Sequence, residues 1–180
     1  MRLFVALEPS PAFRDALSRL QDRLRQAGIT GRYLTPSNLH LTLAFIGEWP
    51  EDVTPVLPPV SRPFSIALSR PGIFPGARVL WAGVDECAPL NALARRVREC
   101  LTASGIPHDP QAFNPHITLL RKPVLPREDL LSSVEVPKAS MTVREVCLYR
   151  SCRTEQGLTY SVIGRTGPAA PLSAPLPCRK

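Results

Sequence analysis

Two segments of the sequence repeat a histidine and a threonine at the same spacing. They are residues 38–43, NLHLTL, and residues 114–119, NPHITL, which match at four of six positions and lie 76 residues apart. The chain has three histidines, and two of them, His40 and His116, stand in this H-x-T-L pattern. An imidazole has an unperturbed pKa of about 6.5, so one histidine can accept a proton near neutral pH while a second donates one. The repeat therefore predicts a pair of acid–base catalysts.

Strand parity explains why the threonines belong with the histidines. Side chains two residues apart in a β-strand point to the same face, so Thr42 shares a face with His40. Thr118 shares a face with His116 in the same way, while the aliphatic residues that alternate with them point into a core. A threonine hydroxyl can donate to a phosphate oxygen on which charge develops. The four side chains predict in-line substitution at phosphorus, with one imidazole deprotonating water and the other protonating the departing ribose oxygen.

The elements expected around this cleft are short strands and a few helices. Strands are expected at residues 2–7, 39–46, 64–68, 77–84, 116–120, 141–150 and 158–163, and helices at residues 11–27, 51–60 and 90–101. A turn at residues 71–76 is expected to join the third and fourth strands. Helices do not alternate regularly with strands, which favours an α+β fold with antiparallel sheets over a doubly wound one. Because each motif follows a helix, we expect two pseudo-symmetric lobes around a central cleft.

Length, composition and charge limit the class of protein. The chain has 180 residues, 44% of them hydrophobic, which suits one well-cored domain at residues 1–165. Residues 166–180 are rich in proline and alanine and are expected to form a disordered tail. The net charge of +7 favours phosphate-rich partners such as RNA. No long apolar run and no export signal occur, so we expect a cytoplasmic protein, monomeric and without a membrane segment.

Metal and cofactor sites are not expected. The five cysteines include no C-x2-C pair, and their closest spacing is C-x4-C. That spacing does not match a zinc site, so the cysteines are expected to be free thiols. No carboxylate cluster accompanies the histidine motifs. We therefore expect metal-independent chemistry without a cofactor.

The motifs resemble those of a known family, the RNA 2′,3′-cyclic phosphodiesterases of the two-histidine phosphoesterase superfamily, LigT-like proteins once named 2′–5′ RNA ligases. The resemblance covers most of residues 1–165 and rests on residues 2–6, 38–47, 113–121 and 148–151. It implies a bilobal α+β fold with a central cleft and hydrolysis of RNA 2′,3′-cyclic phosphate ends to 2′-phosphomonoesters. It also implies a weak, reversible 2′–5′ ligation of RNA.

The resemblance also implies roles for individual residues. His40 resembles the general acid of the family, and His116 resembles the general base that activates water. Thr42 and Thr118 take the phosphate-binding positions, and Arg121 corresponds to an arginine that contacts phosphate in relatives. Arg121 lies five residues after His116, so a regular strand would place it on the opposite face. Either a bulge or the end of the strand must turn it back.

The remaining aromatic residues and the third histidine have other expected places. Tyr33 and Tyr149 are candidates for stacking on a base or for lining the cleft. Phe45 has odd parity against His40, so it is expected in the core. His108 stands in a Gly/Pro/Asp loop before the second motif and is expected to be a solvated loop residue.

Two other functions fit the same residues. The histidine pair could open the cyclic phosphate of a small nucleotide, such as an ADP-ribose derivative, instead of an RNA end. The chain could also be an RNA-end binding module without turnover. Such a module is expected to have lost a histidine or a threonine of the pair, and all four are retained here.

Overall fold

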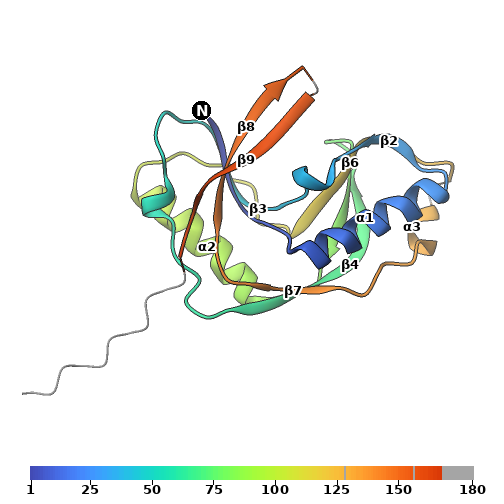
Figure 1. The fold of residues 1–180 in the computed structure, drawn as a ribbon, viewed down its shortest axis with the longest axis horizontal. Coiled ribbons are helices and arrows are strands. Elements are labelled where there is room, and N and C mark those ends of the chain that lie inside the picture. The colour runs from blue at the N-terminus through green and yellow to red at the C-terminus, as the bar shows by residue number, and fades with distance from the viewer. Residues whose placement is uncertain (128, 156, 168–180) are drawn as a thin grey trace, which may run out of the picture.

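The computed structural model describes residues 1–127, 129–155 and 157–167, and it contains two long helices and a large sheet (Figure 1). The strands are β1 (Arg2–Leu7), β2 (Thr30–Tyr33), β3 (Leu41–Glu48), β4 (Phe64–Phe74), β5 (Val79–Val84), β6 (His116–Val124), β7 (Ser140–Val143), β8 (Cys147–Thr154) and β9 (Gly157–Arg165). The helices are α1 (Pro11–Gln26), α2 (Ala88–Ala103) and the single turn α3 (Leu130–Ser133), with 3-10 turns η1 (Pro36–Asn38) and η2 (Thr54–Val56). The predicted α+β class is confirmed.

The sheet divides into two lobes at one residue pair. Its strands are antiparallel and follow the order β7-β4-β5-β6-β3-β1-β8-β9, with β2 paired to β6. β3 and β6 meet through Leu41 opposite Ile117. We call β1, β3, β8 and β9 the first lobe, and β2, β4, β5, β6 and β7 the second lobe. Each lobe carries one histidine motif at this division, so the predicted bilobal arrangement is confirmed.

Each long helix follows a strand of one lobe in the sequence but packs against the other lobe. α1 follows β1 of the first lobe, but its Gln21 side chain donates to the carbonyl of Leu119 in β6 of the second lobe. α2 follows β5 of the second lobe, but its Arg98 side chain donates to the carbonyl of Leu43 in β3. Figure 1 shows α1 on the side of β4 and β6, and α2 on the side of β3. The exchange buries one face of each half-sheet and leaves the other face for the cleft.

Local sequence accounts for the first helix. Ser10 caps it by accepting a hydrogen bond from the Phe13 N–H at 3.4 Å, and Pro11 occupies its first turn. The buried stripe recurs at three- and four-residue steps and consists of Phe13, Ala16, Leu17, Leu20, Gln21 and Leu24. Gln21 is the polar exception in this stripe.

Two predicted strands have different bounds in the structure. β4 runs through the predicted turn, because Pro71 pairs with Ala82 and Gly72 with Trp81. The indole lies so close to Gly72 that a Cβ there would be 2.3 Å from the ring, so this position requires glycine. The single strand predicted at residues 141–150 is two strands, β7 in the second lobe and β8 in the first.

The second predicted helix and the start of the predicted C-terminal tail also differ from the structure. The helix expected at residues 51–60 is only the 3-10 turn η2, because Pro55, Pro58 and Pro59 interrupt the run. Thr166, placed in the predicted tail, is buried: its N–H donates to the Val146 carbonyl, and its side-chain hydroxyl accepts from the Val146 N–H. The rest of that tail, from residue 168, lies outside the described residues. No helix in the described part of the chain is long and apolar enough to cross a membrane.

Candidate active site

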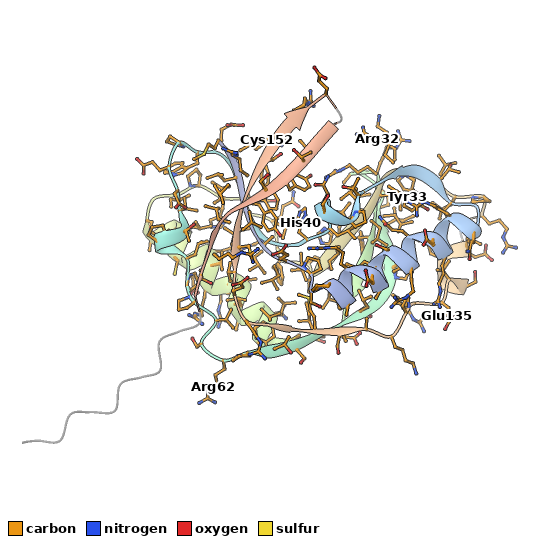
Figure 2. All side chains as sticks on the ribbon, viewed as in Figure 1. Arg32, Tyr33, His40, Arg62, Glu135 and Cys152 are labelled. Atoms are coloured by element: carbon orange, nitrogen blue, oxygen red, sulfur yellow. The ribbon has the colours of Figure 1, made fainter. Side chains whose placement is uncertain are left out.

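The two motif histidines are oriented by identical backbone contacts. His40 donates from Nδ1–H to the carbonyl of Asn38 at 2.7 Å, and His116 donates from Nδ1–H to the carbonyl of Asn114 at 2.7 Å. A carbonyl can only accept, so these contacts fix the proton on Nδ1 of each neutral ring. Each Nε2 is left as the atom that can take or give a proton. In Figure 2, His40 lies near the middle of the molecule, between the two lobes.

Strand register places both histidines and both threonines at the division between the lobes. Residues that flank an antiparallel pair approach one another in reverse order. Because Leu41 pairs with Ile117, His40 lies on the side of Thr118, and His116 lies on the side of Thr42. A positive charge on His116 would lower the pKa of His40, as expected for neighbouring imidazoles. The structure thus brings together the four side chains that the repeat singled out.

Cross-strand neighbours show that the threonines face the cleft. Thr42 lies opposite Ala6, which belongs to the small cluster with Phe4 and Tyr149 rather than to the main core. Thr118 lies opposite Trp81. Directly opposed residues of an antiparallel pair share one face of the sheet, so each threonine shares its face with aromatic side chains that contact the histidines.

A β-bulge in each motif strand solves the parity problem of Arg121. On β5, Leu80 and Trp81 are consecutive, but their partners on β6 are Leu120 and Thr118, so Leu119 is an extra residue. Arg121 then pairs with Val79, two residues from Trp81 on β5, and returns to the face of Thr118. Its charge acts on His40 across the division and lowers the pKa of that imidazole. Of the two alternatives expected from the sequence, a bulge or the end of the strand, the structure has the bulge, and Arg121 lies on the cleft face of β6.

The same irregularity on β3 overturns the core position expected for Phe45. Val5 and Ala6 on β1 pair with Ala44 and Thr42, so the residue between these partners is extra, as in β6. Beyond this bulge Phe45 points to the cleft side and packs against the small cluster that contains Phe4. The core prediction was wrong because it assumed an unbroken alternation.

Aromatic rings surround both imidazoles. The centroid of the His40 ring lies 4.7 Å from Phe4, 5.0 Å from Tyr160 and 5.8 Å from Tyr149. On the second lobe, the ring of His116 lies 4.9 Å from that of Phe74 and 6.1 Å from that of Trp81. Such rings exclude water and disfavour the charged form of histidine.

Burial consequently depresses the pKa of both histidines. It lowers the pKa of His40 to about 4, with smaller contributions from the charges of Arg121 and His116, against a raising effect of the Asn38 carbonyl. Burial also lowers the pKa of His116, against a similar effect of the Asn114 carbonyl. Both rings are neutral at pH 7 in the protein alone. An anionic phosphate between them would favour protonation and raise both pKa values.

A basic groove of about 650 Å³ adjoins the histidine pair. It runs between β2 and the β8–β9 hairpin, and its lining includes Arg32, Arg121 and Arg153 together with Asn38 and Tyr160. The Asn38 side chain fixes the hairpin to this edge, because it donates to the Leu158 carbonyl at 2.8 Å and accepts from the Tyr160 N–H at 3.2 Å. Figure 2 labels Arg32 and Tyr33 at the opposite side of the groove from the hairpin. The groove offers cations and an aromatic edge to an anionic chain.

The two tyrosines predicted from the sequence have different places. Tyr33 lines the groove, but Arg25 covers its ring at 4.0 Å from the centroid and its hydroxyl donates to the Ile29 carbonyl. Tyr149 is 3% exposed and stacks on Phe4 at 5.0 Å, so no base can reach its ring. This corrects the stacking role expected of Tyr149. The sequence analysis missed Tyr160, which lines the groove and contacts His40, because nothing in its hairpin marks it out.

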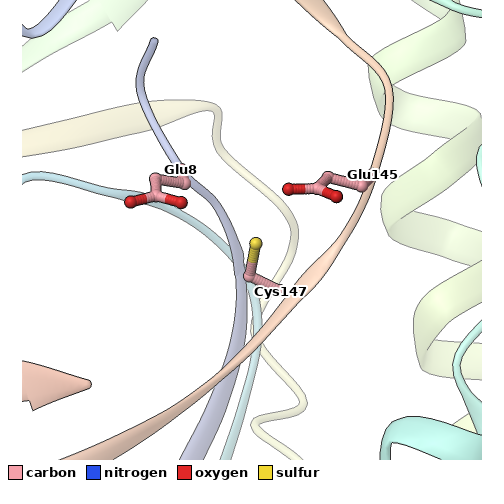
Figure 3. A group of neighbouring side chains, drawn as sticks. All are labelled: Glu8, Glu145 and Cys147. Atoms are coloured by element: carbon pink, nitrogen blue, oxygen red, sulfur yellow. The ribbon is translucent and has the colours of Figure 1, made fainter. Parts of the chain in front are cut away.

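A second polar cluster lies at the end of β1, where Glu8 and Glu145 approach Cys147 (Figure 3). Arg165 donates to both carboxylates and to the Cys147 sulfur, so a guanidinium already occupies the place of a cation. Burial alone would raise the pKa of Glu8, but Arg165 and Arg14 hold it below its usual value. Burial raises the pKa of Cys147 to about 11, which keeps it a thiol. The cluster is an ion-pair network that ties β9 to β1 and β8.

Known proteins are similar to this chain over most of its length. The sequence profile of the 2'-5' RNA ligase superfamily matches residues 9–155. A protein of Archaeoglobus fulgidus named RNA 2',3'-cyclic phosphodiesterase is 33% identical over 175 residues, covering 89% of this chain and 96% of that protein. One of the same name from Methanothermobacter thermautotrophicus is 31% identical over 176 residues, covering 89% and 95%. The crystal structure of E. coli LigT complexed with 3'-AMP has a TM-score of 0.73 at 27% identity, covering 94% of this chain and 98% of that one.

Proposed function

The chain belongs to the 2'-5' RNA ligase superfamily, and from this premise we propose that it hydrolyses the 2′,3′-cyclic phosphate at RNA ends to a 2′-phosphomonoester. The observation that carries the proposal is the matched pair of imidazoles. Each of them has its proton fixed on Nδ1 and its Nε2 free for transfer. Two such groups at one division between lobes supply the acid and the base that opening a cyclic phosphodiester requires.

In the proposed reaction, neutral His116 takes a proton from water at Nε2 as the water oxygen bonds to phosphorus. The bond from phosphorus to the 3′ oxygen breaks, and protonated His40 gives its Nε2 proton to that oxygen. The product carries a 2′-phosphomonoester and a 3′-hydroxyl. Thr42, Thr118 and Arg121 donate to the non-bridging oxygens, on which charge develops in the transition state. The chemistry needs no metal ion.

The depressed pKa of His40 sets a condition on this mechanism. An acid with a pKa of about 4 is largely deprotonated at pH 7, so the substrate itself must help to charge it. A cyclic phosphate beside the ring carries a negative charge that favours the imidazolium. His40 therefore becomes protonated when the substrate binds. In the protein without substrate, both imidazole rings are neutral.

Incubation of the protein with an oligoribonucleotide that ends in a 2′,3′-cyclic phosphate tests the proposal. We expect its conversion to a product that co-migrates with the authentic 2′-phosphate standard and not with the 3′-phosphate standard. A 2′,3′-cyclic mononucleotide and an ADP-ribose cyclic phosphate, assayed in parallel, separate RNA from small-nucleotide substrates. An unchanged oligonucleotide after prolonged incubation would reject the activity, and binding without turnover would favour an RNA-end module.

Metal independence is tested in the same assay. Because the two imidazoles and the donors around them supply the proton transfers and the charge stabilisation, we expect EDTA to leave the initial rate unchanged. A rate that falls with EDTA and returns on addition of Mg²⁺, Mn²⁺ or Zn²⁺ would contradict this part of the proposal. A known metal-dependent nuclease serves as the positive control for chelation.

A further inference from the structure

A buried glutamine joins β6, the strand of the second motif, to the segment of the chain that precedes His40. Gln21 is 2% exposed, and its Nε2 donates to the carbonyls of Leu119 and Leu34, both at 2.9 Å. Leu119 is the bulged residue of β6, and Leu34 stands in the segment that leads to His40. Both partners are carbonyl oxygens, so the amide nitrogen must face them and both of its protons are used. A buried amide costs stability unless it is bonded in this way.

An arginine on the other helix makes the reciprocal connection. The Nε of Arg98 donates to the Leu43 carbonyl at 3.0 Å, and its Nη1 donates to the Gln111 carbonyl. Leu43 is the bulged residue of β3, and Gln111 stands in the segment that leads to His116. The guanidinium also lies 5.9 Å from the ring centroid of Phe113 in that segment.

Each contact joins the segment before one motif to the strand that carries the other motif. Gln21 ties the approach to His40 to the strand that carries His116, and Arg98 ties the approach to His116 to the strand that carries His40. Each also donates to the carbonyl of a fully buried leucine at a bulge. Backbone hydrogen bonds join the same segments, from the Leu34 N–H to the Leu119 carbonyl at 2.9 Å and from the Asp109 N–H to the Phe45 carbonyl at 2.8 Å, and the two side chains add to these connections. The β3–β6 contact itself is a single residue pair, so it constrains the relative placement of the imidazoles weakly.

We propose that Gln21 and Arg98 are positioning residues that hold the two imidazoles in the geometry needed for paired proton transfer. The inference rests on the proposed function. Among the described residues, neither side chain forms a hydrogen bond with a histidine, and their effect passes through the bulged strands and the segments before the motifs. A displacement of reacting groups by about 1 Å can cost on the order of a hundredfold in rate, so small slips at the bulges would reach the chemistry.

Gln21→Met and Arg98→Met test the proposal, because methionine is unbranched and flexible but donates no hydrogen bond. We expect kcat on an RNA 2′,3′-cyclic phosphate to fall about ten- to a hundredfold, with a smaller change in KM. Arg98→Lys, which can reach one carbonyl but not both, should recover part of the loss. Gln26→Met on α1 and Arg95→Met on α2 are matched controls at exposed sites and should keep wild-type kcat.

Imidazole proton signals provide a readout that overall stability does not move. The chain has three histidines, so each signal can be assigned with a single substitution. In folded Gln21→Met and Arg98→Met, the signals of both motif histidines should shift, and that of His108 should move less. Folded variants with wild-type kcat or with unshifted motif signals would overturn the inference. If Gln21→Met does not fold, the two Arg98 variants decide. If the wild-type protein lacks phosphodiesterase activity, the proposed function fails, while the imidazole signals still report on positioning.

Discussion

The two lobes share a motif and a bulge, but they place different side chains at the equivalent position beyond it. Phe45 follows His40 by five residues, and Arg121 follows His116 by five residues. Both are turned to the cleft side by the extra residue in their strand. In the first lobe this position adds an apolar ring to the cluster around Phe4, and in the second it adds a cation. The backbone decides where a side chain points, and the residue at that position decides what it contributes.

The surroundings of the two histidines differ in the same sense. Three aromatic rings lie against His40, and two lie against His116. The pKa of His40 falls to about 4 through burial and through the charge of Arg121, whereas that of His116 falls through burial without a contribution from Arg121. In the proposed mechanism, the imidazole of the first lobe therefore depends on substrate for its charge, and we expect Arg121 of the second lobe to attract this substrate.

Removal of either imidazole should cause the largest loss of activity among the changes that compare the two lobes. His40→Ala and His116→Ala should each lower kcat/KM at least about a thousandfold, because each deletes a proton transfer worth roughly 10² to 10⁴ and leaves the other partner unmatched. Steady-state hydrolysis of an RNA 2′,3′-cyclic phosphate measures the loss, and circular dichroism checks the fold.

His108 provides the matched control. Its ring contacts Thr102 and the Asp109 carbonyl beside α2, away from the motif contacts. His108→Ala should keep wild-type kcat/KM within about a factor of three, as surface changes outside a site do. Near-wild-type turnover of His40→Ala or of His116→Ala would exclude the paired mechanism.

The cation of the second lobe accounts for the next largest effect. Arg121→Met should raise KM for the cyclic phosphate about ten- to a hundredfold, because a charge-assisted contact to phosphate contributes more than a neutral one. The equivalent change in the first lobe, Phe45→Leu, removes only aromatic packing and should leave KM within about threefold. Measured KM values for the two variants compare the lobes directly. An equal effect of both would mean that Arg121 acts through packing and not through its charge.

Sequence patterns predicted which residues meet between the lobes better than they predicted the boundaries of the strands. The repeated motif identified His40 and His116 because a strand keeps alternate residues on one face over short stretches. The same rule failed for Phe45, since a bulge inserts one residue and reverses the parity beyond it. Arg121 was singled out because of the resemblance to a family, and its placement required either a bulge or the end of the strand; the structure has a bulge there.

The positioning residues and Tyr160 lay beyond sequence reasoning for a different reason. Gln21 stands in a stripe of apolar residues, where a polar side chain indicates only that some partner exists. Its partners, Leu34 and Leu119, are joined to each other by a backbone hydrogen bond, and Gln21 reaches both because α1, which follows β1 of the first lobe, packs on the second lobe. Tyr160 reaches His40 across the sheet from β9. Such contacts depend on which lobe each helix packs against, and local sequence patterns do not indicate this.

The smallest predicted effect is a shift in the titration of one histidine. The positive charge of Arg121 disfavours the imidazolium form of His40, so Arg121→Met should raise the pKa of His40 above about 4. Burial remains the larger cause and is unchanged, so the pKa should stay below the ordinary value of about 6.5. The pKa of His116 should not move, because Arg121 does not contribute to its shift. Titration of the imidazole proton signals by NMR in unliganded protein measures both histidines in one sample.

The same titration fixes the sign of the stability change with pH. Because the folded-state pKa of His40 lies below that of the unfolded chain, the unfolded chain binds more protons between about pH 6.5 and 4. The contribution of His40 to stability is therefore present above pH 6.5 and lost as the pH falls toward 4. Because Arg121→Met should raise the folded-state pKa of His40, this loss of stability should end at a higher pH in the variant. A rise of both histidine pKa values by the same amount would instead indicate a general loosening of the cleft. A rise confined to His40 would show that the cation of the second lobe acts on the imidazole of the first.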